Sequence, residues 1–590
     1  MYCAKVVLRL LPLFLGALLA SAASSRKYLG RRNNGAASSP FVSTSLDGKF
    51  IVNGSEFQFI GTTAYWLPSL NSDQDIVDTI SNMSAAGFKV VRTWGFNDVE
   101  AIPENGTWFQ LVANGTTTIN NGTNGLQRLD KVIEVAEQHG MYVLISLTNN
   151  WNPRPLFDNI TILANGTVVN GTTNSSTLQS RDVTPGTNNT LPRNFLSNDY
   201  GGMDLYVRQL GVNSQHDEFY TNRTIVETFK NFTTAIVSRY ANRPSVFAWE
   251  VANDPQCNSS LATSPTCTAQ VVTKWHAEVA AHIKTVDPNH LVSSGNQGFF
   301  CMGCEKLFFK PQAAPRPQAS PAPGVRRRSI LMLTKDRVLK QRQQLWKQNR
   351  QLKQLAGIIP TNGVRIRGNW VATPTRRQGD LAVGSAFDGS HGVDSQDIMA
   401  IPQIGFSSFQ LFPDQFVYGP DDPSLTPFEN KVQHGLTWIQ QQANSAAILN
   451  KPIALTGFGL VTQNNTNAFV PFNSSVAPFG SGSLSTSSQQ PFGVTDAERD
   501  QAYNQWVNAG IIGGLQGIIQ YQWSQPNLTV QAGTTISPLA TENGQVPNQG
   551  ETGQSPNDGY SMQGVGREDS LQSVLSGGIA QFGADRPPRR

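Results

Sequence analysis

Short apolar runs alternate with amphipathic segments along most of this chain, from Phe57 to about Trp523. The run "KVVRTWGF" precedes "LQRLDKVIEVAEQHG", whose apolar residues recur three and four positions apart and so share one face of a predicted helix. Further strand-like runs are "SVFAWEV", "PIALTGFG" and "GIIQYQW". Strands that alternate with helices indicate parallel βαβ units. About eight such units are present, which predicts an α/β fold, a (β/α)8 TIM barrel.

Two regions interrupt this alternation. Residues 306–385 begin with a Pro-rich stretch, and between Lys306 and Arg377 they hold seventeen Lys and Arg against one Asp. The formal net charge of +4 therefore combines an insertion of about +16 with a remainder of about −12. We expect the insertion to be largely disordered, although its second half could form a helix. Residues 527–590 form a low-complexity tail in which we expect little packed structure. The barrel is then expected in two parts, 41–305 and 386–526.

The N-terminus indicates secretion. Residues 1–22 combine basic Lys5 and Arg9 with the apolar core "LLPLFLGALLA" and small residues before a cleavage site near Ala22, the pattern of a signal peptide. An N-terminal membrane anchor is the alternative. About sixteen Asn-x-Ser/Thr acceptors follow, which together indicate an extracellular glycoprotein. No later run of 18 apolar residues occurs, so we expect no membrane span.

The cysteines fit an oxidising compartment, which favours disulfides over metal sites. We prefer a Cys257–Cys267 pair, and Cys301 and Cys304 could form a tight bridge or half of a zinc site. Histidines are scattered without metal-ligand spacing, so we expect no metal and no organic cofactor; they include His276, His290 and His391.

Aromatic and polar residues gather where strands are predicted to end. Arg92 and Trp94 follow one strand, "NNW" with Asn150 and Trp151 follows the next, and Asn253 follows a third. In a barrel, the carboxyl ends of the strands carry the chemistry. Sugar sites combine aromatic platforms with a few fixed hydrogen-bonding groups. A single tryptophan could simply be packing, but the repeated combination predicts a carbohydrate site.

These motifs occur in an order that resembles one family. The segments "GTTAYWL", "VVRTWGFND", "NNWN", "DYGGMDLYVRQLG", "HDEFYTN", "RPSVFAWEVANDP", "DPNHLVSSGNQGFF" and "QLFPD" are similar to the fungal endo-β-1,4-mannanases of glycoside hydrolase family five. The resemblance runs from about Phe41 to Trp523 and implies a (β/α)8 barrel, secretion, and a cleft for β-mannan in the cell wall. Carried over position by position, it gives the substrate-binding positions Trp66, Arg92, Trp94, Asn150, Trp151, Asn253, Gln410, Phe412 and Trp523.

The resemblance also locates two catalytic positions, and both are altered. Members of the family are retaining enzymes, which need two carboxyl groups about 5–5.5 Å apart. The acid/base position is Asp254, whose side chain is one methylene shorter than the family's glutamate. The nucleophile position in "KPIALTGFG" is Gly457, which has no side chain to form a glycosyl intermediate. Thr456 precedes it and has no evident base.

Other family positions have changed too. The His-x-Tyr that orients the nucleophile is Gln410-Leu411-Phe412, a family glutamate is Gln297, and the last-strand tryptophan position is Ile519, with Trp523 as a replacement. An error of register is the competing explanation.

Three hypotheses follow. In the first, the protein is a mannanase homologue, a weak or dead enzyme, that binds β-mannan or a related glycan. In the second, it is an active endo-β-mannosidase that uses a displaced carboxylate, Asp414 or Glu250. In the third, the basic insertion binds an anionic wall polymer, against the alternative of a solvated loop without a partner. We expect a monomer with a polysaccharide partner and with neither nucleic acid nor membrane as a partner.

Overall fold

The computed structural model describes residues 39–103, 105–152, 160–162, 168–170, 195–310, 384–465, 493–531, 553–562 and 567–583. All of them belong to one compact unit, Ser39–Arg590. The predicted signal peptide and residues 311–383 of the insertion lie outside the described residues. The hypotheses about those two segments therefore stay predictions.

Eight parallel strands form the centre of this unit and confirm the predicted barrel. Their order in the sheet is β13-β12-β9-β5-β4-β16-β15-β14. A parallel bridge between Ser293, which ends β13, and Phe406, which precedes β14, joins the two outer strands and closes the sheet. The strands are β4 (Phe59–Thr63), β5 (Val90–Trp94), β9 (Tyr142–Ser146), β12 (Val246–Glu250), β13 (Leu291–Ser293), β14 (Ser407–Leu411), β15 (Ile453–Phe458) and β16 (Gly517–Gln520).

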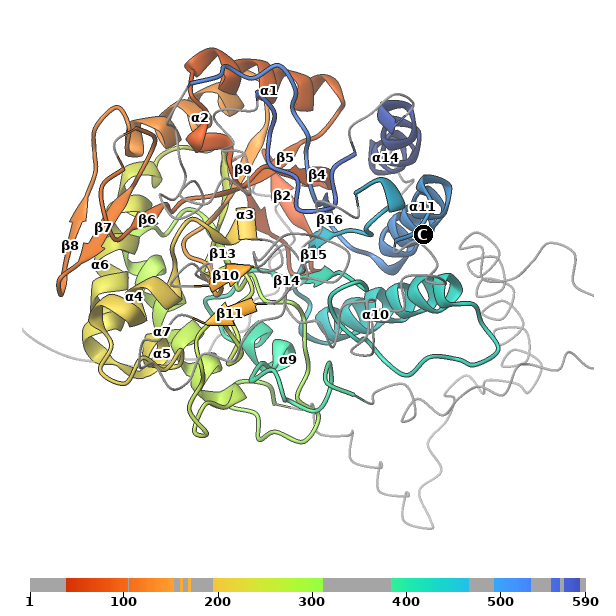
Figure 1. Ribbon diagram of the computed structural model, residues 1–590. Coiled ribbons are helices and arrows are strands. Elements are labelled where there is room, and N and C mark those ends of the chain that lie inside the picture. Colours follow the sequence, from red (N-terminus) through yellow and green to blue (C-terminus); the bar gives the residue numbers. More distant parts are fainter. Residues whose placement is uncertain are drawn as a thin grey trace, which may run out of the picture. The chain divides into compact units, whose positions relative to one another are not determined.

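Long helices surround these strands (Figure 1). They are α1 (Asp73–Ala85), α2 (Leu126–Gln138), α6 (Arg223–Tyr240), α7 (Ala269–Val286), α10 (Pro427–Leu449) and α11 (Asp496–Gly513). Capping boxes begin α10 and α11, since Thr426 pairs with Glu429 and Thr495 pairs with Glu498. Each helix buries an apolar face on the strands, for example Leu129, Val132 and Ile133 of α2. The predicted alternation of strand and helix is therefore the order of the barrel.

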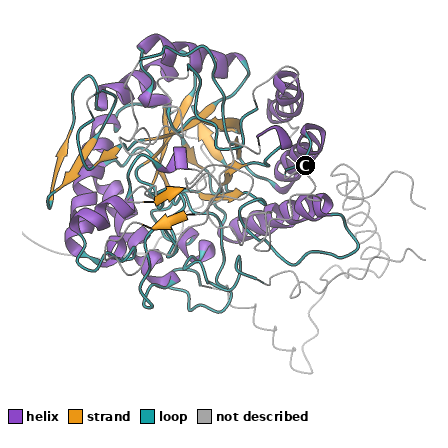
Figure 2. Cartoon of the chain, viewed as in Figure 1, coloured by secondary structure: helices purple, strands orange, loops and turns teal. Residues whose placement is uncertain are grey.

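Shorter elements occupy the connections, as the colouring by secondary structure shows (Figure 2). They are β1 (Ser43–Thr44), β2 (Phe50–Val52), β3 (Ser55–Phe57), β6 (Asp98–Val99), β7 (Gln110–Ala113), β8 (Thr116–Ile119), β10 (Ile160–Ile162), β11 (Val168–Asn170), α3 (Phe195–Asn198), α4 (Met203–Leu210), α5 (Glu218–Thr221) and α9 (Ser395–Met399).

Aromatic side chains fill the amino-terminal half of the barrel. The ring of Phe50 in β2 lies 5.1 Å from the rings of both Phe247 and Phe406. Ile519 belongs to the same buried cluster and is fully enclosed. This apolar layer leaves the carboxyl ends of the strands as the end that can hold a polar site.

Two parts of the tail are packed, so the expectation of little packed structure after residue 527 is wrong for them. Residues 553–562 run over the ends of barrel strands and are mostly buried. Helix α14 (Arg567–Gly583) packs against α11 and β4 and thus follows β16 as a further barrel helix. At Gly578 an added Cβ would lie 2.8 Å from Val507 and 3.4 Å from Ile60, so the glycine permits close packing.

Both cysteine pairs are disulfides: Cys257–Cys267, as preferred, and Cys301–Cys304. The second pairing contradicts the zinc half-site, because a zinc ligand must be a free thiolate. None of the helices in the described part of the chain has the length and apolar character that crossing a membrane requires.

Candidate functional site

A cavity opens at the carboxyl ends of the barrel strands. Its lining residues come from the ends of β5, β9, β12, β13, β14 and β16 and from α3: Arg92, Trp94, Trp151, Ser197, Asn198, Asn253, Asp254, Gln297, Gln410, Phe412, Gln415 and Tyr521. The structure therefore brings most of the site residues predicted from the sequence into one place. The exceptions are Trp66, Asn150 and Trp523, and the nucleophile position Gly457 lies beside the cavity.

A buried ion pair supports the floor of this cavity. The Arg92 Nε donates to both carboxylate oxygens of Glu250 at 3.2 Å, and its Nη2 donates to the same carboxylate and, at 2.8 Å, to Asn253 Oδ1. The hydroxyl of Ser146 also donates to Glu250. Arg92 is 1% exposed and Glu250 is fully enclosed. Glu250 is thus the counter-ion that fixes Arg92, and Arg92 in turn orients the Asn253 amide at the cavity.

Asp254 lies in the cavity wall with both carboxylate oxygens in hydrogen bonds. The indole N–H of Trp151 donates to Oδ2 at 2.7 Å, and Gln256 Nε2 donates to Oδ1 at 2.8 Å. The Asp254 backbone has φ of 53°, a left-handed conformation that few non-glycine residues adopt, and its N–H donates to Gly295 O. These two donors satisfy both oxygens of Asp254 and fix the orientation of its carboxyl group in the cavity wall.

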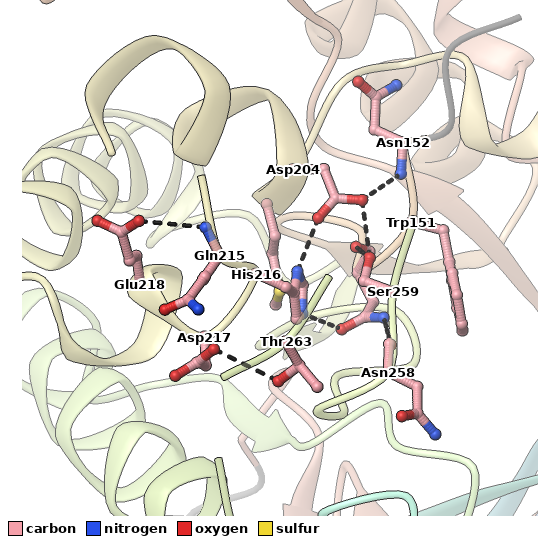
Figure 3. Close-up of polar contacts among 12 residues, drawn as sticks. Trp151, Asn152, Asp204, Gln215, His216, Asp217, Glu218, Asn258, Ser259 and Thr263 are labelled. Atoms are coloured by element: carbon pink, nitrogen blue, oxygen red, sulfur yellow. Dashed lines mark hydrogen bonds and ion pairs between the residues drawn. The ribbon is translucent and has the colours of Figure 1, made fainter. Parts of the chain in front are cut away.

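A polar cluster lies beside Trp151 and contacts Asn152, the residue that follows it (Figure 3). His216 Nδ1 lies 2.7 Å from Asp204 Oδ1, and Ser259 donates to Asp204 Oδ2 at 2.7 Å. The backbone N–H of Asn152 donates to the same oxygen at 3.4 Å. Burial raises the pKa of Asp204, but His216 and the other partners outweigh it, so the pKa lies below its usual value. The segments "DYGGMD" and "HDEFYTN" therefore supply the support for Asn152 and for the loop after Asp254.

Asn150 belongs to this support rather than to the cavity lining. Its Oδ1 accepts hydrogen bonds from the hydroxyl of Tyr220 at 3.1 Å and from the backbone N–H of Gln256 at 3.0 Å. His216 Nε2 lies 3.0 Å from the same oxygen. Asn150 is therefore not among the cavity lining residues, because its side chain joins two loops behind the wall, and its direct contact with substrate stays a prediction.

Gly457 lies on β15 next to the cavity. An ideal Cβ there would lie 3.4 Å from Phe412 Cζ and 3.5 Å from Gln410 Oε1, both of them lining groups. These are ordinary contact distances, so a Cβ at this position would contact Gln410 and Phe412 without a clash. Thr456 is no substitute, since its buried hydroxyl donates to Phe409 O at 3.3 Å.

Amide side chains bridge the ends of β13, β14 and β12. Gln297 Nε2 donates to Gln410 Oε1, and Gln410 Nε2 donates to Asn253 Oδ1, each at 3.3 Å. Among the lining residues that the structure describes, Asp254 is the only carboxylate. Asp414 lies outside the lining; it pairs with Lys431 at 2.6 Å and accepts the N–H of Val461 at 2.7 Å.

The aromatic residue at the end of β16 is Tyr521, which the sequence reasoning missed. Ile519 lies in the barrel core, and the Trp523 ring packs on Phe88 with a centroid distance of 5.7 Å, away from the lining. Because side chains alternate along a strand, the residue two positions after the inward-facing Ile519 faces inward as well. This alternation of side chains along the strand could have identified Tyr521 from the sequence. Trp66 is fully enclosed in the core and is not part of the lining.

The family described as Cellulase (glycosyl hydrolase family 5) matches residues 50–374, which is more than half of the chain. The chain belongs to this family. The mannan endo-1,4-beta-mannosidase F of Aspergillus clavatus is 37% identical over 253 residues, which cover 42% of this chain and 45% of that protein. The mannan endo-1,4-beta-mannosidase A of Aspergillus aculeatus is 35% identical over 268 residues, 45% of this chain and 56% of that protein. The chain thus spans about half the length of these curated relatives.

Solved structures of the family share the fold. The endo-1,4-beta-mannanase from Rhizomucor miehei superposes with a TM-score of 0.54 at 21% identity, covering 92% of this chain and all of that one (100%). The endo-beta-1,4-mannanase from Thermotoga petrophila gives a TM-score of 0.52 at 20% identity, covering 91% and 79%. At these identities the likeness shows the barrel fold alone.

Proposed function

We propose that this protein is a secreted, mannanase-like member of glycoside hydrolase family 5 that binds β-1,4-mannan or a related glycan and hydrolyses it weakly or not at all. The observation that carries the proposal is Gly457: a retaining mechanism needs a nucleophilic carboxylate opposite the acid, and β15 supplies none. The similarity to mannan endo-1,4-beta-mannosidases supports the substrate class. The aromatic and amide lining supports binding of a neutral sugar.

The alternative is an active mannan endo-1,4-β-mannosidase with a displaced carboxylate. Two contacts speak against it. Glu250 is enclosed and neutralised by Arg92, and Asp414 is engaged by Lys431 and Val461. Using Glu250 as a nucleophile would leave the buried Arg92 cation without its partner, which costs several kcal/mol, and Asp414 would have to give up its contacts with Lys431 and Val461. Secretion is supported by two disulfides and by exposed acceptor asparagines such as Asn53, Asn114 and Asn231.

The test combines binding and cleavage. We expect the purified full chain to be retained on insoluble β-mannan and to release few reducing ends from galactomannan. Cleavage at the rate of the Aspergillus relatives would overturn the loss of activity, and absence of retention would overturn glycan binding.

The double variant Asp254→Glu with Gly457→Glu tests the assignment of the two positions. It lengthens the carboxyl side chain at position 254 by one methylene and adds a carboxylate at position 457, and we expect reducing-end release to rise by at least about 10²-fold, the lower end of what a positioned general acid contributes. The matched control is Asp254→Gln with Gly457→Gln, which adds similar bulk without carboxyl groups and should stay inactive. Equal rates in the two double variants would show that these positions do not carry the chemistry.

A further inference from the structure

Residues 553–562 lie over four neighbouring strands of the barrel. The segment contacts Tyr65 after β4, Gln415 after β14, Gly459 after β15 and Tyr521 after β16. Tyr560 is 1% exposed and Asp558 is 2% exposed. These strands are consecutive in the sheet, so the segment covers one side of the barrel mouth, the side that contains the nucleophile position.

Tyr560 packs directly behind the cavity. Its ring centroid lies 5.4 Å from that of Phe412 and 5.6 Å from that of Tyr521, and its hydroxyl accepts a hydrogen bond from Gln415 at 2.6 Å. All three partners line the cavity. The ring fits because residue 459 is glycine: a Cβ there would lie 2.5 Å from Tyr560 Cδ1. Tyr560 therefore holds three lining side chains at once.

Asp558 holds the other end of Tyr521. Its Oδ2 accepts the hydroxyl of Tyr65 at 2.6 Å and that of Tyr521 at 3.0 Å. Its Oδ1 accepts the backbone N–H of Ser197, a further lining residue, at 3.4 Å. The Tyr521 ring is thus fixed at its hydroxyl by Asp558 and by a T-shaped ring contact with Tyr560.

We propose that residues 553–562 are part of the glycan site, and that Tyr560 and Asp558 are positioning residues that set its aromatic wall, Phe412 and Tyr521. This inference rests on the proposed glycan binding. Stacking of a sugar on an aromatic ring depends on the position and tilt of the ring. If Phe412 and Tyr521 lose their support, we therefore expect the site to lose affinity for glycans and the ability to select among them.

Paired variants test the proposal in the full chain with β-1,4-mannohexaose as the probe. We expect Tyr560→Ala to weaken binding about tenfold or more, as truncation of a buried aromatic anchor does at interfaces. Tyr560→Phe keeps the ring and should stay within about threefold of the wild type. Asp558→Asn keeps one acceptor for the two phenols and should bind better than Asp558→Ala. Where Tyr560→Ala does not fold, Tyr560→Leu fills the volume without the ring and replaces it in the comparison.

A control separates positioning from loss of stability. Tyr240, at the end of α6, is 3% exposed and contacts Asp130 of α2, outside the cavity. Tyr240→Ala should leave mannohexaose affinity unchanged; an equal loss of affinity in Tyr240→Ala and Tyr560→Ala would overturn the proposal.

Amide hydrogen exchange supplies a readout that needs no glycan. Tyr560→Ala should speed exchange at residues 410–415 and 521–523, whereas Tyr240→Ala should not. If the wild type binds no mannan, the proposed function is wrong. The exchange result then still shows whether residues 553–562 hold Phe412 and Tyr521 in place. Unchanged exchange and unchanged affinity in Tyr560→Ala would overturn the inference itself.

Discussion

At the scale of single residues, the site depends most on the buried ion pair between Arg92 and Glu250. The Arg92 guanidinium is 1% exposed, so the stability of the fold depends on its partner carboxylate. The same pair sets Asn253, because Arg92 donates to the Asn253 side chain at 2.8 Å. The pair is therefore a structural requirement of the cavity even where hydrolysis is absent.

We predict that Glu250→Gln lowers the free energy of unfolding by about 3–5 kcal/mol, because it leaves the Arg92 charge buried without a counter-ion. Urea unfolding followed by tryptophan fluorescence measures the change. The matched control is Glu278→Gln, which breaks the exposed pair with Arg223 (distance 2.7 Å) and should cost about 1 kcal/mol or less. Similar losses of unfolding free energy in the two variants would contradict the argument that burial makes the Arg92–Glu250 pair more costly to break.

Much of the lining could be predicted from the sequence, since many of its residues lie at or after the carboxyl end of a strand. Arg92, Trp94, Asn253 and Gln410 follow or end apolar runs, and chain order alone puts them at the same end of a parallel barrel. Tyr521 was missed because the choice between neighbouring positions depends on the alternation of faces within the strand. Asn150 was expected at the cavity, but the position of a residue along the chain does not show how deeply its side chain lies. Asn150 and Trp151 are adjacent, yet only Trp151 reaches the cavity.

At the scale of elements, the last helix shows where composition misleads. The sequence of α14, "REDSLQSVLSGGIAQFG", contains few large apolar residues, and its glycines lower helix propensity. Tertiary contacts determine the structure of this segment instead. Val574 and Leu575 are 3% and 1% exposed, and Gly578 permits close approach to Val507. A Gly-rich composition predicts disorder only where the segment has no neighbouring surface to pack against.

The Cys257–Cys267 disulfide constrains the loop that carries Asp254 and Gln256. It closes a separation of 10 residues, and we predict that replacing both cysteines with alanine lowers stability by about 3 kcal/mol, from the loop-closure entropy of the unfolded chain. The Cys301–Cys304 bridge, with a separation of 3, should cost about 2 kcal/mol when removed in the same way. Chemical denaturation under non-reducing conditions measures both losses. A larger loss from the shorter loop would contradict the entropic account.

At the scale of the whole molecule, Asp558 couples the docking of residues 553–562 to pH. Burial raises the pKa of Asp558 to about 6 from a model-peptide value of 3.8, although the hydroxyls of Tyr65 and Tyr521 oppose the rise. The charge of Asp558 also raises the pKa of Tyr200, together with burial. The folded state thus prefers the protonated carboxyl. This preference stabilises the fold fully below the unfolded value of 3.8 and is lost as the pH rises through about 6.

Asp558→Asn isolates this effect, because asparagine resembles the protonated acid at every pH. We predict that the stability of the wild type relative to this variant falls by up to about 3 kcal/mol between pH 4 and pH 7, the free energy that corresponds to roughly two pKa units. Buried His276 and His391, each with a pKa lowered to about 4 by burial, act in the opposite direction, but they are common to both proteins and cancel in the difference. Unfolding curves at several pH values give the result. A difference that does not change with pH would mean that the pKa of Asp558 is the same in the folded and unfolded states, and the docking of residues 553–562 would then not depend on pH through Asp558.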